Sequence, residues 1–128
     1  MQTIKPYWSK NKLETRQFDL MSNWDQDRYW AGYFTTDPEL KIVCKRFSRL
    51  INFVRKVLVK ASLSNPSVYD DHHLTLLRAE ELLAIMQHHD GITATSKSYI
   101  ERGFKERMAN SSIELLEAVR KVLKPQVI

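Results

Sequence analysis

Apolar residues recur at intervals of three and four positions along three long stretches of the chain, which predicts three amphipathic helices. The first helix is expected to begin where Thr36 or Asp37 supplies a capping oxygen and Pro38 occupies the first turn. It would end before Pro66. Its predicted buried face consists of Leu40, Val43, Cys44, Phe47, Leu50, Ile51, Val54, Val57 and Leu58.

The second and third stretches complete an all-α pattern. Asp70 and Asp71 can cap the second helix, whose predicted face is Leu74, Leu77, Leu82, Ile85 and Met86, broadened by Leu76, Ala79 and Leu83. The third runs from about Ser96 to Lys124, with Ile100, Phe104, Met108, Ser112, Leu115, Val119, Val122 and Leu123 along one stripe. Gly103 within it suggests a close helix contact. Residues 38–128 are therefore predicted to form a three-helix bundle.

Residues 1–37 follow neither a helical nor a strand period for long, so we predict an irregular N-terminal arm. The arm is rich in aromatic residues, which are Tyr7, Trp8, Phe18, Trp24, Tyr29, Trp30, Tyr33 and Phe34. Contiguous apolar patches are unusual on an isolated soluble domain. We therefore expect these aromatic side chains either to lie on the chain's own helices or to contact a neighbouring domain.

Composition limits the possible classes of protein. A chain of 128 residues with 43% hydrophobic content is long enough for one helix-rich domain with its own core. Its single cysteine, Cys44, excludes an internal disulfide framework. No apolar run approaches the roughly 20 residues of a membrane span. The N-terminus also lacks the apolar segment of a signal peptide.

The positive charge is concentrated on the first predicted helix. Residues 38–69 carry seven Lys and Arg against Glu39 alone, in a chain of net charge +5. A basic stripe opposite an apolar face is commonly the solvated side, but it could also bind nucleic acid or an acidic protein partner. Phosphate binding would weaken steeply with salt and should be abolished by alanine at Lys45, Arg49 and Lys56.

His88, His89 and Asp90 stand together where the second predicted helix stops. Gly91 is well suited to the left-handed residue that ends many helices, which would place both histidines in the last turn. Imidazole beside a carboxylate is a common metal-ligand pairing. A protonated histidine complementing the helix dipole would produce the same sequence, and local chemistry leaves both interpretations open. Asp70-Asp71-His72-His73, by contrast, favours a helix cap with solvated histidines over a metal site.

Two segments resemble those of a known enzyme family. Gln87-His88-His89-Asp90-Gly91-Ile92-Thr93-Ala94-Thr95 resembles the Gln-His-His-Asp-x-Ile-Thr-x-Thr motif in the helical middle domain of glycoside hydrolase family 38 α-mannosidases, of the Golgi and lysosomal type. Tyr29-Trp30-Ala31-Gly32-Tyr33-Phe34-Thr35-Thr36-Asp37-Pro38 resembles the family segment Tyr-Trp-x-Gly-Tyr-Tyr/Phe-Thr-Ser-Arg-Pro. The resemblance covers roughly residues 18–124. Ala94 stands where the family usually has glycine, and Asp37 where it commonly has arginine.

The resemblance implies a zinc-dependent, retaining α-mannosidase that removes terminal α-mannose from N-glycans. It implies that His89 ligates zinc, that Asp90 bonds sugar hydroxyls and that Trp30 forms a wall of the mannose pocket. It implies that His88 either lines the site or orients its neighbour. Glycoside hydrolysis needs two carboxyl groups flanking the bond, and only Asp90 lies beside the histidines. We therefore expect no catalytic residue in this segment.

The resemblance also implies partners and a compartment. The remaining zinc ligands and the catalytic carboxylates would come from an N-terminal catalytic domain, and a C-terminal β domain would complete the parent enzyme. The substrate would be a mannose-containing oligosaccharide. The parent enzyme would act in the lumen of the lysosome or Golgi. We expect the chain to be an excised piece of a secretory protein, folded but inactive alone.

Overall fold

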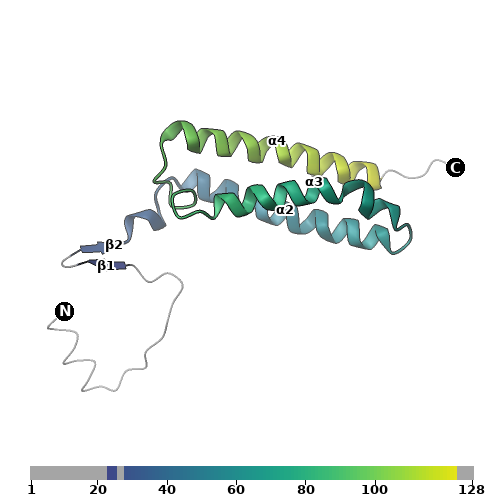
Figure 1. Cartoon of the computed structure of the whole chain (residues 1–128), viewed down its shortest axis with the longest axis horizontal. Helices are drawn as coiled ribbons and strands as arrows, with labels where there is room; N and C mark the ends of the chain where they lie inside the picture. The colour runs from purple at the N-terminus through teal and green to yellow at the C-terminus, as the bar shows by residue number, and fades with distance from the viewer. Residues whose placement is uncertain (1–22, 26–27, 124–128) are drawn as a thin grey trace, which may run out of the picture. The chain divides into compact units, whose positions relative to one another are not determined.

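The computed structural model describes residues 23–25 and 28–123. These residues form three long helices, α2 (Pro38–Ser62), α3 (Ser67–Met86) and α4 (Ser98–Leu123), preceded by two short strands and one 3-10 turn (Figure 1). Each helix packs against the other two. The predicted all-α three-helix bundle is therefore confirmed.

Helix α2 begins where the sequence predicts. Asp37 is its N-cap, and the carboxylate accepts a hydrogen bond from the amide of Leu40 at 3.0 Å, while Pro38 fills the first helical position. Lys105 of α4 lies 3.1 Å from Asp37 and 2.6 Å from the carboxylate of Glu39. The start of α2 is thus tied to the first half of α4.

The core confirms the predicted face of α2, whose buried residues all belong to that face. Each helix contributes to one cluster, made of Leu40, Cys44, Phe47, Ile51, Val54 and Leu58 from α2, Leu76, Ala79, Leu82 and Met86 from α3, and Met108, Leu115 and Val119 from α4. Burying a valine, leucine, isoleucine, phenylalanine or methionine side chain contributes about 1.5–3 kcal/mol relative to leaving it in water. No side chain in the described ranges is both polar and buried, so the core depends on apolar packing.

All four buried residues of α3 belong to the predicted face, but the buried part of that face is narrower than predicted. Leu74 and Ile85 are 55% and 48% exposed, and Leu77 is exposed as well, whereas Leu76, Ala79, Leu82 and Met86 are buried. The predicted face was too wide because leucine and isoleucine occur around most of this helix, so periodicity does not set the limits of the buried side.

The start of α3 also differs from the prediction. The helix begins at Ser67, and Asp70 lies within its first turn rather than at the cap. Asn65 takes part of the capping role, because its side-chain oxygen accepts hydrogen bonds from the amide of Ser67 at 3.3 Å and from the Ser67 hydroxyl at 2.9 Å.

Helix α4 begins at Ser98, and Lys124 and Pro125, predicted to mark its end, lie outside the described residues. Its predicted stripe is buried at Met108, Leu115 and Val119 but exposed at Ile100 and Leu123. The close helix contact expected at Gly103 is absent, because a Cβ built there would meet nothing within 4 Å.

The described part of the arm contains short elements that the sequence did not predict. Strand β1 (Asn23–Asp25) pairs antiparallel with β2 (Arg28–Trp30), with Trp24 opposite Tyr29, and a 3-10 turn, η1, covers Gly32–Phe34. Strands of three residues are too short to show an alternating pattern in the sequence. Contacts divide the chain into two units after Phe34. Tyr7, Trp8 and Phe18 lie outside the described residues.

Candidate functional site

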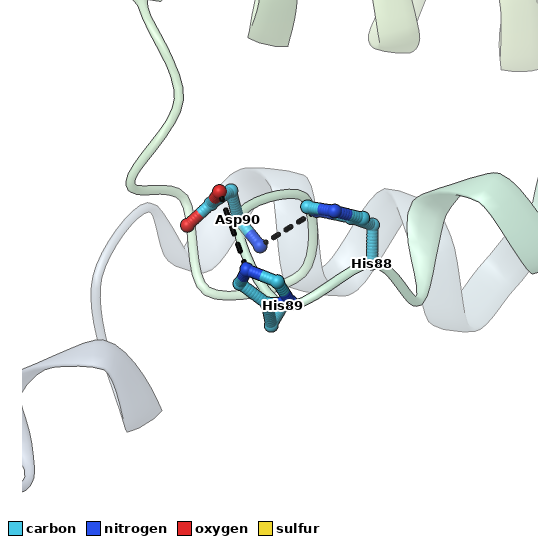
Figure 2. A group of neighbouring side chains, drawn as sticks. All are labelled: His88, His89 and Asp90. Carbon is cyan, nitrogen blue, oxygen red and sulfur yellow. Dashed lines mark hydrogen bonds and ion pairs between the residues drawn. The ribbon is translucent and has the colours of Figure 1, made fainter.

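The connection between α3 and α4 carries the candidate site (Figure 2). Helix α3 ends at Met86, and the amide of its C-cap, Gln87, donates to the carbonyls at the end of the helix. His88, His89 and Asp90 therefore lie in the turn beyond the helix, not in its last turn as predicted. A turn, unlike a helix, can bring three consecutive side chains together.

The glycine of the turn serves a different purpose from the one predicted. Gly91 has no positive φ, so it is not a left-handed cap. It is buried, and a Cβ there would stand 2.9 Å from the carbonyl oxygen of Met86, closer than a real Cβ contact. Glycine is needed at position 91 because the turn folds tightly back on the end of α3.

The left-handed residue of the turn is Ala94, with φ 57°. Left-handed backbone costs an L-residue roughly 1–2 kcal/mol, which glycine does not lose. This is the position at which the resembling motif has glycine. The backbone at Ala94 thus has the conformation that glycine would favour, and the substitution leaves the turn formed.

The ligand atoms of His88, His89 and Asp90 lie within 4.8 Å of one another. The two imidazole rings stack with centroids 4.2 Å apart, and Nε2 of His89 lies 3.5 Å from Oδ2 of Asp90 (Figure 2). Two ligands bonded to one tetrahedral zinc at about 2.0–2.2 Å stand roughly 3.3–3.6 Å apart, so the spacing of this pair fits a shared cation as well as an ion pair.

The exposure of the cluster limits what it can do alone. The side chain of His89 is 82% exposed and that of Asp90 is 56% exposed. Structural zinc sites use four protein ligands, and catalytic ones use three plus water or substrate. An open group of three ligands at the surface fits part of a zinc site that another polypeptide segment completes.

No second cluster of this kind occurs within 23–25 and 28–123. His72 and His73 lie in the first half of α3, where Nδ1 of His73 is 2.9 Å from the carbonyl of Asp70 and the ring stacks on Tyr69. Asp70 and Asp71 do not cap the helix, which corrects that part of the prediction.

Asp90 is exposed yet held at almost every polar atom. Its amide donates to Nδ1 of His88 at 3.0 Å, its carbonyl accepts from the hydroxyl of Ser96 at 2.7 Å, and Oδ1 accepts from the hydroxyl of Thr95 at 3.0 Å. The sequence did not reveal these partners. The only signal was that hydroxyl residues follow the aspartate closely, and such residues are common in any turn.

An open hollow adjoins the turn between the end of α3 and the start of α4. It is lined by Ala84, Ile85, Gln87, His88, Asp90, Gly91, Ser96, Ile100 and Phe104. Polar groups of His88 and Asp90 thus stand beside an apolar wall, a combination common in small-ligand sites. Gln87, the first residue of the motif, also reaches α2, because its amide donates to the buried thiol of Cys44 at 3.4 Å. Burial raises the pKa of the Cys44 thiol.

Trp30, the predicted pocket wall, ends strand β2 and is 58% exposed. It belongs to the unit that ends at Phe34, whereas His88, His89 and Asp90 belong to the helical bundle. An exposed indole offers the flat apolar face that stacking on a sugar needs. Its role as a pocket wall stays a prediction.

The basic side of α2 is solvent-exposed as predicted. Of the seven cations of α2, Lys41 is half-buried and the other six are exposed, namely Lys45, Arg46, Arg49, Arg55, Lys56 and Lys60. A second groove, between α2 and α3, includes Lys41, Lys45 and Arg55, but Arg55 is paired with Glu80 at 2.6 Å. Binding of an anionic partner by this side stays a prediction.

The described part of the chain is thus a three-helix bundle that carries an exposed His-His-Asp turn. The chain belongs to the alpha-mannosidase middle domain family, whose model matches residues 28–125. This match confirms the family predicted from the two motifs. No solved structure matches the chain.

The curated relatives are much longer than the chain. It is 28% identical over 112 residues to a lysosomal alpha-mannosidase of Dictyostelium discoideum, which covers 86% of this chain and 11% of the relative. It is 31% identical over 99 residues to alpha-mannosidase F of the same organism, and the match covers 77% of this chain and 10% of that relative. With alpha-mannosidase 2 of Drosophila melanogaster the identity is 31% over 102 residues, and the match covers 79% of this chain and 8% of that relative.

The chain thus spans about a tenth of the length of these relatives. This share agrees with the prediction that the residues match one segment of a longer α-mannosidase. Within the described ranges, no helix has both the length and the apolar character needed to cross a bilayer.

Proposed function

We propose that these residues form the middle domain of a zinc-dependent, retaining α-mannosidase that removes terminal α-mannose from N-glycans. The observation that carries the proposal is the grouping of the His88, His89 and Asp90 ligand atoms within 4.8 Å, on the turn that bears the family's motif. Membership of the alpha-mannosidase middle domain family supports a mannosidase as the parent enzyme.

His89 is the proposed zinc ligand of this domain. The side chain of His89 is more exposed than that of Asp90, with which it interacts. Among the described residues, the nearest partner of its Nε2 is Oδ2 of Asp90, at 3.5 Å. The other ligands come from an N-terminal catalytic domain. When bound, zinc supplies electrostatic positioning of sugar hydroxyl oxygens next to the glycosidic bond.

Asp90 is the proposed acceptor for sugar hydroxyls. Its Oδ1 is already bonded to Thr95, so Oδ2 is the oxygen that it presents. A carboxylate accepting from a hydroxyl makes a charge-assisted hydrogen bond, which is roughly twice as strong as a neutral one.

His88 is the proposed donor at the edge of the hollow. Its Nδ1 accepts from a backbone amide, so a neutral ring carries its hydrogen on Nε2 and can donate it to a substrate oxygen. Trp30 is the proposed apolar wall against the sugar ring.

The rest of the mechanism lies outside this domain. Retaining glycoside hydrolysis requires a nucleophilic carboxylate and an acid-base carboxyl about 5–5.5 Å apart. Asp90 has no other carboxylate in its cluster. We assign both catalytic carboxyls to the N-terminal catalytic domain, place a C-terminal β domain after the bundle, and place the parent enzyme in the lumen of the Golgi or lysosome.

The proposal is tested by comparing the parent polypeptide with this 128-residue chain. Hydrolysis of p-nitrophenyl α-mannoside and zinc content are measured on both. We expect turnover and bound zinc in the parent and no turnover from the chain alone. A parent that has neither zinc nor turnover would refute the proposal, and turnover by the isolated chain would refute the shared site.

A further inference from the structure

We propose that Thr95 is a positioning residue for substrate binding, whose hydroxyl holds Oδ1 of Asp90 so that Oδ2 faces the substrate. This inference rests on the proposed function, because it assumes that Asp90 contacts the sugar. The supporting contact is the 3.0 Å hydrogen bond from Oγ1 of Thr95 to Oδ1 of Asp90. Thr95 lies five residues beyond Asp90, on the far side of the turn.

The hydroxyl of Thr95 has two possible acceptors, and its single hydrogen can go to only one of them. Oγ1 of Thr95 also lies 3.0 Å from Oγ1 of Thr93, which in turn donates to the carbonyl of His89. Each hydroxyl has one hydrogen, and a carbonyl can only accept. With Thr93 committed to His89, Thr95 can donate either to Thr93 or to Asp90. An ionised carboxylate is the stronger acceptor, so the hydrogen of Thr95 goes to Asp90.

The remaining polar atoms of Asp90 restrict the residue further. Its amide is bonded to His88 and its carbonyl to Ser96, so the backbone at Asp90 is fixed from both sides. Only rotation of the carboxylate remains, and the bond from Thr95 removes that freedom. Oδ2 is then directed to the same side as Nε2 of His89, 3.5 Å away.

Fixing an exposed carboxylate in this way has a consequence for binding. A free aspartate at the surface would lose rotamer freedom each time it bound a hydroxyl, and a carboxylate held beforehand does not. Second-layer hydrogen bonds of this kind commonly set the precision of a binding site. Loss of the Thr95 hydroxyl should therefore weaken sugar binding without removing any atom that touches the sugar.

The test uses the parent enzyme with three substitutions. Thr95→Val removes the hydroxyl and keeps the shape, Thr95→Ala removes the hydroxyl and one methyl group, and Thr95→Ser keeps the hydroxyl. Steady-state kinetics on p-nitrophenyl α-mannoside, competition by methyl α-mannoside, zinc content and melting temperature are measured for each. Zinc content and melting temperature report on structure independently of turnover.

We expect Thr95→Val and Thr95→Ala to raise KM and the inhibition constant of methyl α-mannoside by about tenfold, the effect of one lost hydrogen bond to a charged group. The kcat should change by less than about threefold, because the contact is made equally before and during the reaction. Zinc content and melting temperature should match the wild type, and Thr95→Ser should restore KM to within about twofold. In an Asp90→Ala background, Thr95→Val should have no further effect on KM.

Two results would overturn the inference while leaving the proposed function intact. One is an active, zinc-loaded wild type whose KM is unchanged in Thr95→Val and Thr95→Ala. The other is a KM effect that persists in the Asp90→Ala background or that Thr95→Ser does not rescue. A wild-type parent without turnover would refute the proposed function itself, and this inference with it.

Discussion

The amide of Asp90 donates a hydrogen bond at 3.0 Å to Nδ1 of His88, two residues earlier in the chain (Figure 2). An amide nitrogen can only donate, so Nδ1 of His88 must be the unprotonated nitrogen of the ring. Any metal or substrate contact by His88 must then use Nε2. The two adjacent histidines are therefore chemically distinct: a ring nitrogen of His88 accepts from the backbone of the turn, whereas Nε2 of His89 lies beside the carboxylate of Asp90.

The first prediction concerns the tautomers of two histidines. His88 should carry its hydrogen on Nε2, whereas His73, whose Nδ1 lies 2.9 Å from the carbonyl of Asp70, should carry it on Nδ1. Long-range ¹⁵N–¹H correlation spectra of the labelled chain, at a pH where both rings are neutral, distinguish the two forms. The same tautomer at both residues would contradict the hydrogen-bond pattern of the turn.

The second prediction compares two glycines. Gly91→Ala should lower the free energy of unfolding by about 1–3 kcal/mol, because its Cβ would press on the Met86 carbonyl 2.9 Å away. Gly103→Ala in α4 should raise it by about 0.5–1 kcal/mol, because a Cβ there meets nothing within 4 Å and alanine is the better helix former. Urea unfolding of both variants measures the difference. Equal effects would contradict the close packing assigned to Gly91.

The third prediction concerns acid stability at the start of α2. The amide of Leu40, bonded to the carboxylate, holds the pKa of Asp37 below its usual value, and Lys105 acts in the same direction, while partial burial opposes both. The pKa of Lys105 is raised by its hydrogen bonds to Glu39 and Asp37. Because the pKa of Asp37 is lower in the folded state, its stabilisation is present above the unfolded pKa of about 3.9 and is lost as pH falls through the folded value.

Asp37→Asn keeps a capping side chain that tolerates φ 44° but removes the charge. We expect it to lower stability at pH 7 by about 1 kcal/mol or less, since the pair with Lys105 is partly solvated. The loss of stability below about pH 4 should also become shallower than in the wild type. Asp71→Asn, at an exposed position of α3, is the control. If both variants follow the wild-type acid profile, Asp37 does not contribute as described.

The sequence determined some of these features better than others. Helix α2 and its buried face were predictable because charged residues clearly separate its two sides. The width of the buried face of α3 was not, because Leu74, Leu77 and Ile85 are as apolar as their buried neighbours. A glycine used for close approach looks the same in a sequence as one used for a left-handed turn. The roles of Gly91 and Ala94 could therefore be separated only in the folded chain.

The candidate site was predictable in composition but not in geometry. Adjacent His88, His89 and Asp90 indicated a possible metal site, and the motifs gave the family. The hydrogen bonds that fix Asp90 involve Thr95 and Ser96, to which the sequence analysis gave no role at the site. Such contacts depend on how the chain folds back between α3 and α4, and no local pattern encodes that path.

The fourth prediction concerns Trp30. In the parent enzyme Trp30→Ala should raise KM for p-nitrophenyl α-mannoside about tenfold, the loss of one aromatic contact with the sugar ring, with a smaller effect on kcat. Trp30→Phe, which keeps an aromatic face, should lie between Trp30→Ala and the wild type. Unaltered kinetics in Trp30→Ala would show that this exposed indole is not part of the pocket.

The central claim is that this domain donates a zinc ligand, and the most direct measurement is zinc content per polypeptide in the parent enzyme carrying His89→Ala. His73→Ala, on α3 and outside the cluster, is the matched control. We expect His89→Ala to lose zinc and turnover together while His73→Ala retains both. Full zinc content in a folded His89→Ala enzyme would contradict the assignment of His89 as a ligand.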